Sequence, residues 1–215
     1  MSDFLEFLEK RSDDMLELGV QHILIVTVAV LLSTVVGVLV GVISSRTRWA
    51  REMAQAVSGA IFTIPTFALL VLLIGPFGLG PAPVIVALAL YGLMPIIRNT
   101  IVGLTEVDPA TTESAAGMGM TKRQQLLRIE LPLAWPVILS GIRLTVLLMI
   151  GAATIGFIVL GPGYGEFIFT GLYRIGTPVA LNLVLAGTLG VIVVAVLFEL
   201  AFALLRIITV PKGIR

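Results

Sequence analysis

Long stretches of this chain contain no charged side chain. No Asp, Glu, Lys or Arg occurs in residues 53–97, 144–165 or 175–198. A run of about 18 or more mainly apolar residues is long enough to cross the hydrocarbon core of a bilayer as a helix. The chain is 58% hydrophobic and only 13% charged, which is too little polar surface for a soluble domain of this size. The sequence therefore predicts an all-α, multi-pass protein of the cell membrane.

Other features of the composition exclude several classes of site. The chain has no cysteine, so disulfides, thiol chemistry and thiolate metal sites are absent. A net charge of +1 gives no reason to expect a nucleic-acid partner. Membrane lipid is the expected surrounding, and no metal or other cofactor is expected in this chain.

We predict about five transmembrane helices. The Gly- and Pro-rich segment 75–81 divides the longest uncharged stretch into two spans, because both residue types break helices and favour turns. The predicted spans are residues 18–44, 53–74, 83–103, 133–160 and 178–208. Residues 1–17 are acidic and lack the basic start of a cleavable signal, so they are predicted to form an external amphipathic helix or a flexible tail.

Basic residues near the span ends predict the orientation of the chain, because cytoplasmic loops are enriched in Lys and Arg. The opposite side has only Lys10, Arg11 and Arg174. The N-terminus is therefore predicted outside and the C-terminus in the cytoplasm, as an odd number of spans requires. The basic residues that follow the first, third and fifth spans are Arg46, Arg48, Arg51, Arg98, Lys122, Arg123, Arg128, Arg206, Lys212 and Arg215.

Arg143 and Glu199 are ionisable residues inside predicted spans. Charges within a membrane are costly and usually face the interior of a helix bundle or a cavity. With a helical rise of about 1.5 Å per residue, both lie roughly 15 Å from the cytoplasmic side. We predict a structural ion pair between them, and a role in contacting substrate is the alternative.

The long cytoplasmic loop of residues 105–132 carries helix signals of its own. Asp108 suits an N-cap and Pro109 the first turn of a helix. Gly117 or Gly119 can end that helix in a left-handed turn, and Thr121 can cap a second helix. The loop is therefore predicted to present a short exposed helix to a cytoplasmic partner.

A spacing within this loop resembles a known motif. Glu113-Ser114-Ala115 is followed at fixed intervals by Gly119, Ile129 and Leu131-Pro132. This run is similar to the EAA loop of bacterial ABC importer permeases, with Ser114 in place of a second alanine. Length, topology and loop position also match the small permeases of that family, so the resemblance covers nearly the whole chain.

The resemblance implies a small type I ABC importer permease fold in residues 18–215 and a set of partners. Glu113, Ala115, Ala116 and Gly119 would form the face that docks on a cytoplasmic ATPase dimer. A second copy of the permease, or a related one, would complete the pathway. The chain has no Gly-x4-Gly-Lys-[Ser/Thr] loop, so we expect it not to be an enzyme and expect ATP and Mg²⁺ to bind the partner subunit.

Three further stretches, residues 63–70, 90–100 and 161–172, resemble permeases for osmoprotectants such as glycine betaine, choline and carnitine. A methionine or other amino-acid importer is the alternative within the family. A secondary transporter or channel is the alternative from another class, although it would need polar mid-membrane groups, and no internal repeat is evident.

A separate substrate-binding protein outside the membrane is expected, because the chain is too short to hold a fused one. Gly163, Tyr164, Gly165 and Glu166 are predicted as its docking site. Quaternary ammonium groups are typically held by aromatic cages. No such cage is expected here, because both Trp residues fall at the cytoplasmic interface and the Tyr residues are scattered along the chain.

Overall fold

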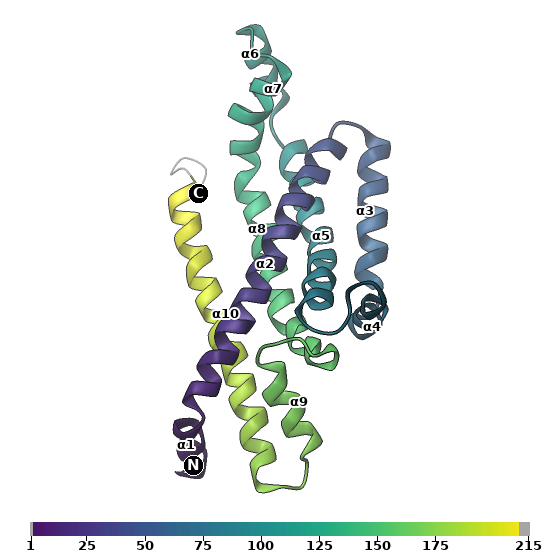
Figure 1. Ribbon diagram of the computed structural model, residues 1–215. Helices are drawn as coiled ribbons and strands as arrows, with labels where there is room; N and C mark the ends of the chain where they lie inside the picture. The colour runs from purple at the N-terminus through teal and green to yellow at the C-terminus, as the bar shows by residue number, and fades with distance from the viewer. Residues whose placement is uncertain (1, 211–215) are drawn as a thin grey trace.

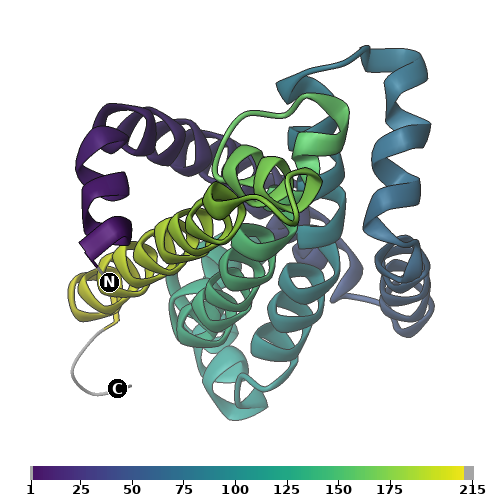
Figure 2. The same cartoon turned by 90° about the horizontal axis from the view of Figure 1, so that it is seen from below.

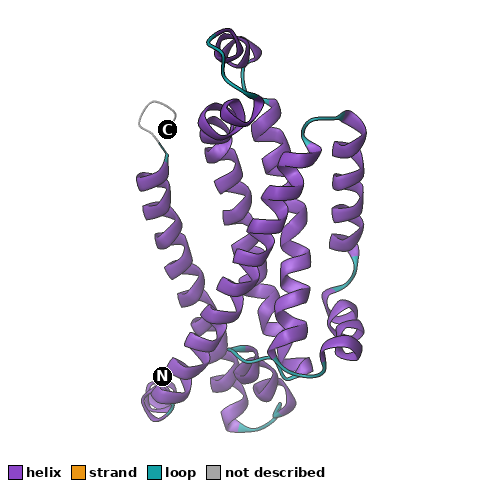
Figure 3. Ribbon diagram, turned by 45° about the horizontal axis from the view of Figure 1, so that its top comes forward, coloured by secondary structure: helices purple, strands orange, loops and turns teal. Residues whose placement is uncertain are grey.

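The computed structural model describes residues 2–210, and it is helical almost throughout, with no strand among those residues (Figure 3). Lys212 and Arg215, two of the basic residues used to predict the orientation, lie outside the described residues. The elements are α1 Ser2–Lys10, α2 Ser12–Ser44, α3 Arg48–Thr63, α4 Thr66–Phe77, α5 Pro81–Thr105, α6 Pro109–Gly117, α7 Lys122–Gln125, the π-helix η1 Leu126–Glu130, α8 Leu131–Ala153, the 3₁₀-helix η2 Thr154–Val159, α9 Gly165–Tyr173 and α10 Pro178–Thr209.

The apolar helices agree with the prediction of about five spans. Four are long and apolar enough to cross a membrane, namely α2, α5, the continuous helical segment Lys122–Val159 and α10. The fifth is the pair α3 and α4, which meet at 95° and pass the same test together. The described ends of the chain lie at opposite ends of the bundle, as an odd number of crossings requires (Figure 1).

The second span is broken, whereas the sequence predicted one continuous span over residues 53–74. The chain leaves the helical conformation at Ile64, with φ −65° and ψ 128°, and at Pro65, with φ −57° and ψ 133°. A proline disfavours the helical conformation for the residue before it, so α3 ends at Thr63 and α4 begins at Thr66. The backbone therefore turns sharply within the apolar part of the chain.

The centre of the bundle is formed by α2, α5 and α8 (Figure 1). At Gly41 of α2, an added Cβ would lie 2.5 Å from Cβ of Thr100 on α5. At Gly37, one turn earlier, it would lie 2.8 Å from Cγ2 of Ile96. Both distances are shorter than real contacts allow, so glycine is what lets the two backbones approach. The small-residue spacing of Gly37 and Gly41 thus has the role expected in a membrane helix pair.

The two ends of the chain are less enclosed. The N-terminal helix is shorter than the segment 1–17 that the sequence assigned to it. It ends at Lys10, and residues 12–17 already belong to α2. The helix α1 contacts both α2 and α10, and seen from below it runs at an angle to α2 (Figure 2). The cytoplasmic half of α10 diverges from the bundle (Figure 3), and few of its residues are buried. One face of α8 and α10 is therefore left uncovered in the single chain.

Substituting Gly41 tests the contact between α2 and α5. We expect Gly41→Ala to lower the free energy of unfolding by about 1–3 kcal/mol, because the added methyl group overpacks against Thr100. The matched control is Gly59→Ala in α3, where an added Cβ has no neighbour within 4 Å. It should be neutral or stabilising by up to about 1 kcal/mol through helix propensity. Thermal unfolding in detergent, followed by circular dichroism, measures both, and equal shifts would contradict the proposed close contact.

Candidate functional site

The segment between α5 and α8, which comprises α6, α7 and η1, projects beyond the rest of the bundle on the cytoplasmic side (Figure 1). Asp108 caps α6, since its Oδ1 accepts a hydrogen bond from the Ala110 N–H at 2.8 Å. Pro109 occupies the first turn. Gly119 has φ +82°, the left-handed conformation that ends many helices. The predicted start and end of this short helix are confirmed.

A second cap begins the helix that leads back to the membrane. The Thr121 N–H donates to Oε1 of Gln124 at 2.8 Å, and the Gln124 N–H donates to Oγ1 of Thr121 at 3.3 Å, which is a capping box. From Lys122 the helical backbone runs without a break through η1 into α8. A π-helical turn such as η1 is uncommon and frequently lies at a functional position. A displacement of this segment is therefore passed directly to α8.

The four residues predicted to dock an ATPase do not share one surface. Glu113, Ala116 and Gly119 are exposed. Ala115 is fully buried, so its side chain does not lie on the exposed face. Its carbonyl accepts a hydrogen bond from the Met120 N–H at 3.1 Å, where the chain folds back against α6. The small side chain of Ala115 allows this turn to close, and Glu113, Ala116 and Gly119 remain the predicted contact residues.

An ion pair connects this segment to the cytoplasmic end of α2. Nη2 of Arg46 lies 2.8 Å from Oε2 of Glu130, and Nη1 lies 3.3 Å from Oε1. The Glu130 side chain is only 8% exposed, whereas that of Arg46 is 49% exposed. Two parallel contacts between a guanidinium and a carboxylate fix distance and angle together. The end of η1 is thus held against the turn that follows α2.

The sequence reasoning did not identify this pair. It used Arg46 to assign the orientation and included Glu130 only as part of the cytoplasmic loop. One signal was present, because Glu130 lies among the apolar residues Leu127, Ile129 and Leu131, where a carboxylate needs a partner. The identity of that partner, 84 positions earlier in the chain, depends on the packing of α2 beside α8.

Arg143 and Glu199 form an ion pair between α8 and α10. Nε of Arg143 lies 3.0 Å from Oε1 of Glu199, and Nη2 contacts Oε2. Their side chains are 53% and 32% exposed, and they line a cavity of about 490 Å³ that also includes Pro136 and Phe202. Because exposing such a pair to lipid is costly, this face of the chain is suited to contact with water or protein.

The predicted external docking residues are mostly buried. Gly163, Tyr164 and Gly165 are enclosed, and only Glu166 of the four is exposed. The Tyr164 hydroxyl donates to the Met15 carbonyl at 2.9 Å, which ties the loop to the start of α2. All three residues are therefore part of the packing at the outer ends of the helices, and the one side chain among them, that of Tyr164, is buried and not available to a binding protein.

His22 also belongs to this external packing. It lies in α2, and its side chain is only 1% exposed. Its Nε2 lies 3.1 Å from the Ile150 carbonyl on α8, and its ring lies 5.9 Å from that of Tyr164. His22 therefore has a structural role in joining α2 to α8 and to the external loop.

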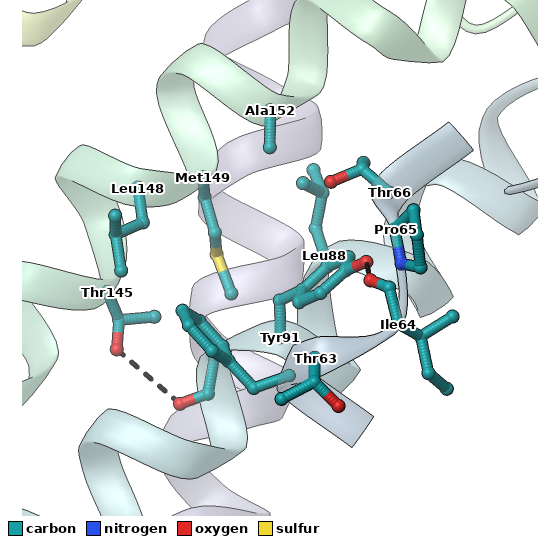
Figure 4. A pocket seen from close by; sticks show the side chains of 12 residues that line it. Thr63, Ile64, Pro65, Thr66, Leu88, Tyr91, Thr145, Leu148, Met149 and Ala152 are labelled. Atoms are coloured by element: carbon teal, nitrogen blue, oxygen red, sulfur yellow. Dashed lines mark hydrogen bonds between the residues drawn. The ribbon is translucent and has the colours of Figure 1, made fainter. Parts of the chain in front are cut away.

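A cavity of about 340 Å³ lies at the break between α3 and α4 (Figure 4). The break contributes Phe62, Ile64 and Pro65, and the other walls are Tyr91 from α5 with Thr145 and Met149 from α8. The Tyr91 hydroxyl donates a hydrogen bond to the Ile64 carbonyl, which the broken helix leaves without a partner in α3. Irregular backbone at membrane depth is tolerated where it lines a cavity, as this break does, and Thr63 and Pro65 are exposed in the single chain.

These features define a class. A bundle of apolar helices with a capped, projecting cytoplasmic segment is suited to transport driven from outside the bundle. The family model described as "Binding-protein-dependent transport system inner membrane component" matches residues 33–206. The chain belongs to this family, so it is a multi-pass inner-membrane component of a transport system that works with a binding protein.

Individual relatives are similar over most or all of the chain. The osmoprotectant import permease protein OsmY of Salmonella typhimurium is 40% identical over 79% of this chain and 72% of its own length. The choline transport system permease protein OpuBB of Bacillus subtilis is 34% identical, and the carnitine transport permease protein OpuCB of Listeria monocytogenes is 35% identical. Each of these two covers 100% of this chain and 97% of its own length.

The fold is that of a type I ABC importer permease, as predicted. An inward-facing structure of the MetNI methionine ABC transporter matches with a TM-score of 0.80 over 92% of this chain and 96% of the matched one. Sequence identity in that match is 19%, so it supports the fold alone.

The two partners in the Arg46–Glu130 pair should differ in their effect on stability. Arg46→Met leaves a buried carboxylate without its cation and should cost about 2–4 kcal/mol of unfolding free energy. Glu130→Gln leaves an Arg that reaches water, so its cost should be about 1 kcal/mol or less. Thermal unfolding in detergent measures both. Exchange of the two residues, Arg46→Glu with Glu130→Arg, restores opposite charges and is the control for the ion pair itself. Equal costs for the single variants would contradict the difference in burial.

Proposed function

We propose that this chain is the permease subunit of an ATP-driven importer of osmoprotectants, that is, quaternary ammonium compounds such as glycine betaine, choline and carnitine. The observation that carries the proposal is the 34–35% identity over the full chain to permeases named for choline and carnitine transport. Residues 63–70, which resemble osmoprotectant permeases in sequence, also support the proposal. In the structure this stretch includes the helix break and part of the cavity wall.

In this proposal, energy reaches the bundle through the cytoplasmic segment. A separate ATPase dimer binds ATP and Mg²⁺ and contacts Glu113, Ala116 and Gly119, which are exposed. Movement of the segment passes along the continuous helix into α8, and the Arg46–Glu130 pair carries it to α2. In this proposal the chain itself supplies no cofactor chemistry. Its helices alternate between two arrangements, one that opens the pathway to the outside and one that opens it to the cytoplasm.

The remaining partners complete the pathway. A second copy of the chain, or a related permease, covers the face of α8 and α10 that carries Arg143 and Glu199. An extracytoplasmic binding protein delivers the solute to the outer end. Glu166 is the one predicted docking residue with an exposed side chain.

Methionine or another amino acid is the second candidate substrate. The match to MetNI is a likeness of fold at 19% identity, whereas the permeases named for osmoprotectants are similar at 34–40%. The osmoprotectant assignment is therefore the better supported of the two.

Uptake into vesicles tests both substrate and coupling. The chain is reconstituted with its ATPase and binding protein, and uptake of labelled glycine betaine, choline, carnitine and methionine is measured with and without ATP. We expect ATP-dependent uptake of a quaternary ammonium compound, reduced at least about 100-fold by Gly119→Trp, because a bulky side chain at the docking surface blocks a close fit with the ATPase.

Gly176→Trp is the matched control. Gly176 also has a positive φ, +94°, and open space around it, but it lies in the external turn before α10. The Gly176→Trp variant has the same kind of backbone strain as Gly119→Trp, but on the opposite side of the membrane from the ATPase. ATP-driven uptake should therefore persist in this variant. Uptake of methionine alone would overturn the substrate class. Uptake that is indifferent to ATP and to Gly119→Trp would overturn the coupling.

A further inference from the structure

The cavity at the α3–α4 break has a composition that the sequence reasoning did not anticipate. We propose that it is a transient site for the quaternary ammonium group of the transported solute, with the rings of Phe62 and Tyr91 as its main contacts. This inference rests on the proposed function and adds a location within the chain. It also modifies the expectation that this chain holds no aromatic cage, because two aromatic rings line the cavity.

The two rings come together only through the fold. Phe62 belongs to the last turn of α3 and Tyr91 to the middle of α5, and their ring centroids lie 5.9 Å apart at an interplanar angle of 84°. Both line the cavity. In an edge-to-face pair, the ring that presents its edge keeps both of its faces clear of the other ring. An aromatic face attracts a cation placed within about 6 Å of its centre, so the pair offers a surface to a trimethylammonium group.

The backbone at the break places the ends of two helices on the cavity wall. The C-terminal end of α3 lies on the cavity wall at Phe62 and Thr63, and a helix C-terminus carries a partial negative charge. The hydrogen bond from the Tyr91 hydroxyl to the Ile64 carbonyl fixes this end of α3 against α5 (Figure 4). Thr66, in the first turn of α4, lines the same cavity, and a helix N-terminus carries a partial positive charge. The two helix ends therefore offset each other, and the attraction for a cation rests on the two rings.

The remaining walls of the cavity can contact the methyl groups of the solute and would bind it only weakly. Leu88, Met149 and Ala152 are apolar, and Thr145 already donates to the Gly92 carbonyl at 3.4 Å. A volume of about 340 Å³ is within the range of small-molecule sites. No acidic residue is among the described residues that line the cavity. Binding by rings and carbonyls alone is weak, as a transport pathway requires, because the solute must also leave.

The rival explanation is a packing gap produced by Pro65. The packing gap and the solute site differ in how transport responds when a larger side chain fills the cavity. A packing gap can be filled from α8 by Ala152→Leu with a gain in stability and no loss of transport. A solute site filled in the same way loses transport.

Direct binding is measured on the permease–ATPase complex in lipid nanodiscs without the binding protein, by saturation-transfer NMR of solute methyl protons. The probes are glycine betaine, choline and 3,3-dimethylbutan-1-ol, the uncharged carbon analogue of choline. We expect choline to bind more tightly than its analogue. Phe62→Leu and Tyr91→Leu should each weaken choline binding about tenfold through loss of a cation–π contact, and Tyr91→Phe should weaken it less because the ring remains.

Phe169→Leu is the matched control. Phe169 pairs with Phe157 at 5.8 Å but does not line the cavity, so choline binding should not change. If Tyr91→Leu fails to fold because the break loses its support, Phe62→Leu and Tyr91→Phe still carry the comparison. Thermal unfolding identifies such a failure.

The outcomes separate this inference from the proposed function. If the intact wild-type importer takes up no quaternary ammonium compound with ATP, the proposed function fails. If it does take one up, but the Phe62 and Tyr91 variants bind and transport choline as the wild type does, this inference alone is overturned. Equal binding of choline and its uncharged analogue, or full transport by Ala152→Leu, would likewise overturn it.

Discussion

The close contact between α2 and α5 is the interaction on which the rest of the bundle depends. Lipid gives no hydrophobic reason for two apolar helices to associate, so the contact relies on dispersion forces between closely fitted surfaces. Gly37 and Gly41 let α2 approach Ile96 and Thr100 without a side chain in between. Once α5 is fixed against α2, α8 packs against both of them, and the external residues His22 and Tyr164 join the outer ends of the bundle.

This arrangement gives the cytoplasmic segment two connections to the bundle. One is covalent, because α7, η1 and α8 are continuous. The other is the Arg46–Glu130 pair, which spans from the end of α2 to the end of η1. Within the segment, the caps at Asp108 and Thr121 stabilise the starts of α6 and α7. A partner that displaces it therefore acts on both α2 and α8, the two helices that enclose α5.

The polar features inside the bundle lie on two different sides of α8. Thr145 and Met149 face the cavity at the helix break, whereas Arg143 faces Glu199 on α10. The first side is enclosed by α3 and α5 of the same chain, and the second is left open in the single chain. A rotation of α8 driven from the cytoplasmic segment would change both at once. In the proposed importer, this links access to the solute site with the contact between the two permeases.

The sequence by itself determined the membrane class, the number and order of the spans, and the caps of the cytoplasmic helix. These follow from local properties, namely the length of apolar runs and the side chains that bond to their own backbone at Asp108 and Thr121. It also placed Arg143 and Glu199 at similar depths, because helical rise converts residue counts into distance. Tertiary structure alone decided that Ala115 and Tyr164 are buried, that Glu130 pairs with Arg46, and that Phe62 meets Tyr91. Each of these depends on which faces of distant helices meet, and periodicity within one helix does not encode the rotation and register of its neighbour.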